Sequence, residues 1–190
     1  MRKIISKSQE EKSRNRKQLS VGLILIAIML MSVIGYGFVG KEEENAQKVN
    51  YNGFEFVKKN EFWITKTGNL QFVFKYNPKE IEKIGGDLKD LENYYGKPVY
   101  ISSDDNEVVA EIYTNLNQIV QRMQKACLEG EKCEDKNLPI KTCKDNFIVV
   151  KESENSKIEQ KENCVFIYGK QEDLLKLGDE FLFKILKIEQ

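Results

Sequence analysis

Residues 98–127 read "PVYISSDDNEVVAEIYTNLNQIVQRMQKAC", and this stretch decides the fold class. It opens with a short run, residues 98–102, whose apolar and β-branched or aromatic side chains are typical of a buried strand. Apolar residues then recur three and four positions apart over residues 106–128, which predicts one long amphipathic helix. Because residues 146–151 predict another apolar strand, the helix is expected to cross between two strands of one sheet.

The sequence before this unit predicts a small antiparallel sheet. Three runs between residues 53 and 76 alternate aromatic or β-branched residues with polar ones, and Asn and Gly separate the runs. This pattern predicts a three-strand meander, whose aromatic side chains are expected to form sheet core rather than a stacking platform for sugars or bases. Asn77 and Pro78 are typical of a helix start, so a short helix is expected over residues 77–84.

The sequence after the unit predicts further strands and a second long helix. Residues 164–169 predict a strand, residues 157–160 a weak one, and residues 172–188 an amphipathic helix. The predicted fold is therefore α+β. It has one mixed β-sheet, made of the three-strand meander and a following β-α-β-β-α unit, and two amphipathic helices pack on that sheet.

The charges divide the chain into three regions. The whole chain has 30 basic and 30 acidic residues. Residues 1–17 hold seven basic and two acidic residues, residues 18–40 hold neither, and residues 41–190 have a net charge of −5. An acidic outer region disfavours nucleic acid as a partner, because binding to a phosphate backbone depends on Lys and Arg.

The uncharged region predicts a transmembrane helix. Residues 18–40 read "QLSVGLILIAIMLMSVIGYGFVG", with no polar stripe. A helix from Ser20 to Gly40 would rise about 31 Å, close to the thickness of the hydrocarbon core of a bilayer. The lipid bilayer is therefore the first expected partner. A cleaved signal peptide is the alternative, but the apolar stretch continues through Val39 and lacks an alanine-rich cleavage pattern.

The basic residues orient this helix. Lys and Arg close to a transmembrane helix stay on the cytoplasmic side, so residues 1–17 are expected to be a cytoplasmic tail. Residues 41–50, "KEEENAQKVN", are predicted to be a solvated linker, and residues 51–190 an extracytoplasmic domain. The expected location is thus the cell membrane, with a single span and the C-terminal domain outside.

Four cysteines, Cys127, Cys133, Cys143 and Cys164, lie in the predicted outer domain, and the chain has no histidine. Their spacing does not match the close pairs of a zinc site or the Cys-x-x-Cys of a thioredoxin-like centre. An even number of cysteines outside the cytoplasm predicts two disulfides. Sequence leaves three pairings open, of which Cys127–Cys133 with Cys143–Cys164 is favoured. Buried free thiols are the alternative.

Asp104 and Asp105 are the candidate carboxylates for chemistry, because they follow a predicted strand and precede a predicted helix. They could bind a divalent cation or a ligand at the edge of the sheet. Asp and Ser also cap helices themselves, and this interpretation is favoured. The chain has no serine-hydrolase elbow, no phosphate-binding glycine loop and no dinucleotide motif, and it lacks histidine as a general base. No cofactor or metal is therefore predicted.

Two resemblances add to this interpretation. Gln18 and Ser20, after a basic segment, resemble part of the processing site of archaeal pilin precursors, although Lys17 replaces the usual glycine and no acidic residue follows. The runs "YNGFEF…WITK…FVFKYNPKEIEKI", "LPIKTCKDNFIVV" and "NCVFIYG…DLLKLGDEFLFKILKI" are similar to a set of small single-pass membrane proteins of archaea with reduced genomes. The second resemblance covers most of the outer domain and implies no activity.

The expected function is a membrane-anchored binding or assembly module of the cell envelope, with an envelope protein as a second partner. The absence of a catalytic motif favours it over an enzyme. An envelope enzyme that uses Asp104 and Asp105 is one alternative, and a pilin-like filament subunit is the other.

Overall fold

The computed structural model describes residue 29, residues 46–133 and residues 135–189. The predicted cytoplasmic tail and, apart from residue 29, the predicted transmembrane helix lie outside the described residues, as does the linker up to residue 45. In the part of the chain that is described, no helix is long and apolar enough to cross a membrane. The chain divides into two compact units, Met1–Ala46 and Gln47–Gln190, and the second is an α+β domain.

The first sheet of this domain is an antiparallel meander of four strands in the order β1-β2-β3-β4. The strands are β1 (Lys48–Tyr51), β2 (Phe54–Lys59), β3 (Phe62–Thr67) and β4 (Leu70–Phe74). The prediction of three strands missed β1, which takes up residues 48–50 of the predicted linker. A tight turn at Asn52 and Gly53, with φ of 46° and 85°, joins β1 to β2. Asn-Gly is the usual pair for such hairpin turns because both positions need positive φ.

The second sheet has five strands in the order β10-β11-β9-β5-β6. The strands are β5 (Pro98–Ser102), β6 (Arg122–Lys125), β9 (Asn146–Glu152), β10 (Lys157–Lys161) and β11 (Cys164–Gly169). β6, β5, β9 and β11 run parallel, and β10 is antiparallel to β11, so this sheet is mixed as predicted. The meander forms a separate sheet, which corrects the prediction of a single one.

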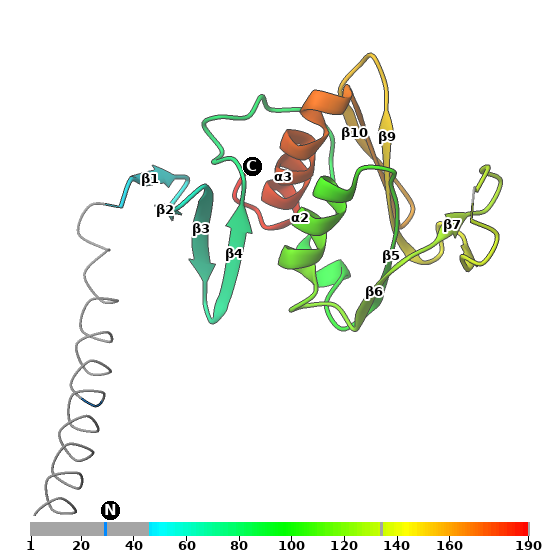
Figure 1. The fold of residues 1–190 in the computed structure, drawn as a ribbon, viewed down its shortest axis with the longest axis horizontal. Helices are drawn as coiled ribbons and strands as arrows, with labels where there is room; N and C mark the ends of the chain where they lie inside the picture. The colour runs from blue at the N-terminus through cyan, green and yellow to red at the C-terminus, as the bar shows by residue number, and fades with distance from the viewer. Residues whose placement is uncertain (1–28, 30–45, 134, 190) are drawn as a thin grey trace, which may run out of the picture. The chain divides into compact units, whose positions relative to one another are not determined.

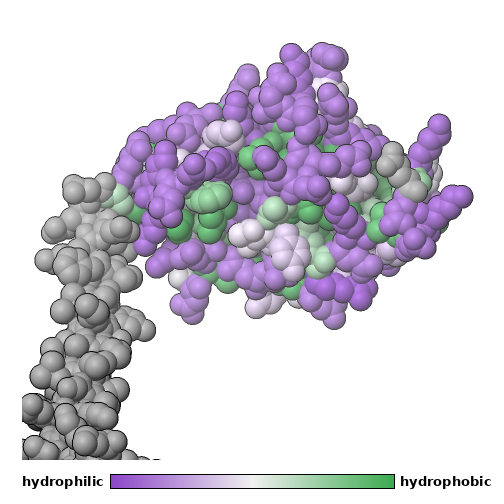
Figure 2. Space-filling view, viewed as in Figure 1, coloured by the Kyte–Doolittle hydropathy of each residue, from purple (hydrophilic) through white to green (hydrophobic). Residues whose placement is uncertain are grey.

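Two helices pack between the sheets (Figure 1). They are α2 (Asn106–Leu116) and α3 (Leu174–Ile185). Phe183 of α3 lies 4.6 Å from Phe74 of the meander, measured between ring centroids, while Val165 and Ile167 of β11 belong to the same buried core. Hydrophilic residues cover most of the face seen in Figure 2, with apolar residues in small separate groups. The helices are therefore covered by a sheet on each side.

The helix predicted over residues 106–128 ends at Leu116, and this corrects the prediction. The chain turns after Leu116, buries Ile119 and Val120, and then adds β6 to the edge of β5. The apolar spacing of these residues is the same whether the chain continues as a helix or turns into an edge strand. Pairing with β5 decides between the two, and pairing of this kind depends on tertiary structure rather than on local pattern.

The short helix predicted over residues 77–84 is also wrong. The expected capping contacts do form, because Asn77 N–H donates to Glu80 Oε2 (2.9 Å) and Lys79 N–H donates to Asn77 Oδ1 (2.9 Å). The helix does not continue, and Ile84 N–H donates instead to the buried carboxylate of Glu180 (3.2 Å). A tertiary hydrogen bond therefore takes the place of the helical one.

Polar side chains of α2 and of the turn that follows it cover the free edge of β4. Asn115 accepts a hydrogen bond from Val73 N–H (2.8 Å) and donates one to Val73 O (2.7 Å). Glu111 accepts one from Lys75 N–H (2.9 Å), and Gln118 donates one to Gln71 O (2.8 Å). Glu111 and Asn115 are four residues apart on one side of α2, and Gln118 follows in the turn after the helix, so together the three side chains mimic a neighbouring strand.

Candidate functional site

The structure brings the four cysteines together in two disulfides. Cys127 pairs with Cys133, with 6.0 Å between their Cα atoms, and Cys143 pairs with Cys164, with 4.9 Å between theirs. This is the pairing favoured from the sequence. Cys127 lies in the short strand β7 (Cys127–Leu128), which pairs with β8 (Ile140–Lys141), and not on a helix as expected.

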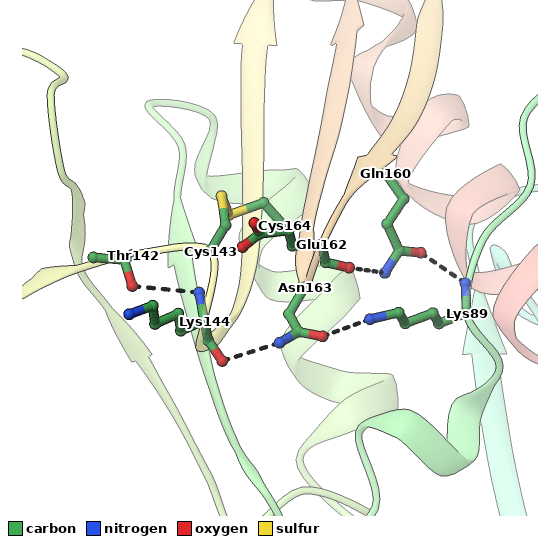
Figure 3. Close-up of a disulfide and its surroundings, with 8 residues drawn as sticks. All are labelled: Lys89, Thr142, Cys143, Lys144, Gln160, Glu162, Asn163 and Cys164. Atoms are coloured by element: carbon green, nitrogen blue, oxygen red, sulfur yellow. Dashed lines mark hydrogen bonds between the residues drawn. A yellow bond between two sulfur atoms is a disulfide. The ribbon is translucent and has the colours of Figure 1, made fainter.

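The Cys143–Cys164 disulfide ties together the beginnings of β9 and β11 (Figure 3). Cys143 lies three residues before β9, and Cys164 is the first residue of β11. Asn163 N–H also donates to Cys143 O (3.1 Å), and Phe147 N–H donates to Asn163 O (3.0 Å). The segment before β9 is therefore held to the turn before β11 by a covalent bond and by backbone hydrogen bonds.

Beside this disulfide lies a polar hollow of about 210 Å³ at the amino ends of the parallel strands. We call it the amide hollow. Its lining residues are Asn93, Lys97, Pro98, Lys144, Asp145, Asn146 and Asn163. Pro98 begins β5, Asn146 begins β9 and Asn163 precedes β11, so three neighbouring strands contribute to it.

Hydrogen bonds between loops hold the amide groups of this hollow in place. Asn93 Nδ2 donates to Asn146 Oδ1 (3.1 Å), and Asn146 Nδ2 donates to the backbone oxygen of Asn93 (3.1 Å). Asn163 Nδ2 donates to Lys144 O (3.0 Å), and its Oδ1 accepts from Lys89 Nζ (2.6 Å), as Figure 3 shows. The amides are thus oriented before any ligand arrives, which lowers the entropy cost of binding one.

The charges in the amide hollow are mainly positive. Lys97 and Lys144 are exposed, and neither ammonium group has a partner among the described residues. Asp145 is the one carboxylate in the lining, and its Oδ1 lies 3.9 Å from Lys141 Nζ. This cationic spot contrasts with the net charge of −5 of residues 41–190.

A second hollow, of about 370 Å³, lies at the opposite, carboxyl end of β5. We call it the acidic hollow. Its lining residues are Tyr76, Asp104, Asp105, Asn106, Glu107, Gln171, Glu172 and Leu175. It contains both carboxylates singled out from the sequence, so it is the place where an enzyme of the predicted kind would act.

The two aspartates have different roles in the acidic hollow. Asp105 caps α2, because its Oδ1 accepts from the N–H groups of Glu107 (2.8 Å) and Val108 (3.1 Å). Its Oδ2 accepts from Gln171 Nε2 (2.7 Å), so both oxygens are occupied. The predicted capping is confirmed for Asp105, while Asp104 is exposed. Among the described residues, no group of three or more His, Cys, Asp or Glu side chains could hold a metal ion.

Buried acids that the sequence analysis did not single out lie between α2, α3 and β4. Asp179 is fully buried, and its Oδ2 accepts from Tyr76 N–H (2.9 Å). Burial raises the pKa of Asp179 well above its ordinary value, and the neighbouring Glu111 carboxyl raises it further. Burial likewise raises the pKa of Glu111. Burial and the proximity of the two carboxyls therefore disfavour the state in which both are ionised.

A similar pair lies at the other side of α3. Burial raises the pKa of Glu180 to about 8, and the adjacent Glu189 carboxyl contributes to the shift. Glu180 is 1% exposed and accepts from Ile84 N–H, so it has no access for a substrate. The buried acids thus hold backbone N–H groups in place and are structural. For Asp179 and Glu180, the available sequence signal was their position among the apolar residues of the predicted C-terminal helix.

Comparison of the chain with protein-family models, curated proteins and solved structures finds no match in any of the three. The functional residues are therefore identified from their geometry and chemistry alone.

Proposed function

We propose that this protein is anchored in the cell membrane by residues 18–40 and carries residues 51–190 outside the cytoplasm as a binding or assembly module of the cell envelope. The anchor and its orientation follow from the uncharged span and the basic segment before it. The observation that carries the proposal is the pairing of all four cysteines of the chain in two disulfides. Such bonds persist outside the cytoplasm and are rare within it.

Binding is favoured over catalysis by the state of the two candidate carboxylates. A carboxylate enzyme needs one group to donate a proton and another to accept one. Both carboxylate oxygens of Asp105 already accept hydrogen bonds, from the first N–H groups of α2 and from Gln171. Asp105 is therefore not free to act as the second carboxylate beside Asp104. The acidic hollow beside Asp104 is the observation that favours the enzyme alternative. The pilin-like alternative depends on residues outside those that the structure describes.

The topology is tested with two variants of the full-length protein, each of which adds one free cysteine to the four cysteines in disulfides. Ser156→Cys places a thiol on an exposed turn before β10, and Ser6→Cys places one in the basic tail. A membrane-impermeant maleimide added to intact cells should label Ser156→Cys, and Ser6→Cys should react only after permeabilisation. The reverse pattern would show that the domain is cytoplasmic. Loss of residues 1–17 from the membrane-bound protein would instead support pilin-like processing.

A further inference from the structure

We propose that the amide hollow is a phosphate-binding site. This inference rests on the proposed role of the domain as a binding module and names the ligand group that it takes. The proposal is supported by unpaired cations, oriented amide donors and a small volume, which occur together in this hollow.

The cations favour an anionic ligand. Lys97 and Lys144 both line the hollow, and each ammonium group lacks a partner among the described residues. Lys89 is a third cation at the same place, since its Nζ is bound to Asn163 Oδ1 rather than to a carboxylate. An ammonium is a compact charge with three N–H donors and is a common ligand of phosphate in proteins. Asp145 opposes these charges, but it lies next to Lys141.

The amides favour a ligand rich in hydrogen-bond acceptors. The side-chain oxygens of Asn146 and Asn163 are occupied by Asn93 Nδ2 and Lys89 Nζ. Each amide nitrogen has two N–H donors, and Asn93, Asn146 and Asn163 use one each in bonds between loops. The three side-chain amides can therefore still offer a ligand mainly N–H donors. A phosphate, whose oxygens are all acceptors, complements this arrangement better than a cation or a neutral donor would.

The size of the hollow favours a single group over a large molecule. Its volume of about 210 Å³ is below the range of roughly 300–1,000 Å³ that is usual for drug-sized ligands. A phosphate group fits this limit whether it is free in solution or at the end of a lipid headgroup. The two sources present the same chemistry to the site, so they are separated by experiment.

The test uses full-length protein, labelled with ¹⁵N and purified in an uncharged detergent. Inorganic phosphate is titrated at constant ionic strength, and the side-chain amide resonances of Asn93, Asn146 and Asn163 are followed by NMR. These resonances should shift in a saturable way. Lys97→Ala/Lys144→Ala should weaken binding by about tenfold, because two surface charge interactions with the phosphate are lost. Lys66→Ala/Lys79→Ala is the matched control, since it removes two exposed lysines outside the hollow and should change affinity less than about twofold.

A second arm places the protein in nanodiscs without added phosphate. Shifts in discs that contain phosphatidic acid, but not in discs of phosphatidylcholine alone, identify a lipid phosphomonoester as the source. If the resonances shift only with inorganic phosphate, the ligand is a soluble phosphate rather than a lipid. The proposal is overturned if neither probe shifts these resonances, if chloride at the same ionic strength shifts them equally, or if both double variants bind like the wild type. None of these results depends on the membrane topology, which the cysteine reporters test separately.

Discussion

The buried carboxyl pair at the edge of β4 predicts how the stability of the domain changes with pH. Replacing Asp179 by Asn tests this directly. The amide can still accept from Tyr76 N–H, and it can donate to the Glu111 carboxylate without needing a proton. The variant therefore keeps the contacts of the wild type and removes one titrating group from the core.

Proton linkage determines whether the stability of the folded state rises or falls with pH. The pKa of Asp179 is raised in the folded protein above its ordinary value of 3.8, so above about pH 4 the folded state keeps a proton that the unfolded state has released. The contribution of Asp179 to wild-type stability therefore falls as the pH rises, until its carboxyl also ionises in the folded protein. The variant lacks this loss, so its stability relative to the wild type should rise by about 1.4 kcal/mol per pH unit.

The relative gain builds up for as long as the pH stays below the raised pKa of Asp179 in the folded protein. Thermal unfolding of both proteins in an uncharged detergent, followed by circular dichroism at several pH values, measures it. A change of 1 kcal/mol corresponds to about 2–4 °C for a chain of this size. The exposed Asp87→Asn is the control and should run parallel to the wild type. A constant difference between Asp179→Asn and the wild type from pH 5 to pH 8 would show that Asp179 is ionised in the folded protein, which would refute the raised pKa.

Four further variants test the fold by denaturant unfolding. Cys143→Ser/Cys164→Ser should lower the free energy of unfolding by about 3 kcal/mol, and Cys127→Ser/Cys133→Ser should lower it by about 2 kcal/mol. The difference arises because the first disulfide closes a loop of 21 residues and the second a loop of only 6. Equal losses would contradict this explanation by loop entropy. Asn115→Ala should lower the free energy of unfolding by about 2–4 kcal/mol, since it leaves Val73 N–H and C=O without partners at the β4 edge. The control Asn117→Ala, at an exposed position, should lower it by under about 1 kcal/mol. Similar losses would mean that water replaces the hydrogen bonds between Asn115 and Val73. Gly86→Ala should destabilise by more than about 1 kcal/mol, because φ is +139° and the new Cβ would lie 2.5 Å from Ile158 O. Gly85→Ala has open space and should be close to neutral, so equal effects would show that the loop simply moves away from β10.

The candidate site was accessible to sequence reasoning only in part. Asp105 could be recognised as a helix cap, because capping depends on residues two and three positions away. The cysteine pairing favoured from the sequence also appears in the structure. The amide hollow could not be foreseen, since Asn93, Asn146 and Asn163 meet only because β5, β9 and β11 are parallel neighbours in the sheet and a disulfide joins the beginnings of β9 and β11. An asparagine at the start of a strand is too common a feature to predict such a meeting.

Local pattern determined most of the elements by itself. We expected strands β2, β3 and β4 of the meander, the apolar strands at residues 98–102, 146–151 and 164–169, and the C-terminal helix. These elements could be predicted because side chains return to the same face every 2 residues in a strand and every 3.6 residues in a helix. Tertiary structure alone decided where α2 ends, that the segment after Asn77 does not become a helix, and that the meander forms its own sheet. In each case backbone groups found their hydrogen-bond partners in a distant element, such as β5 for β6 and Glu180 for Ile84. Partners that far apart in the chain leave no periodic trace in the sequence.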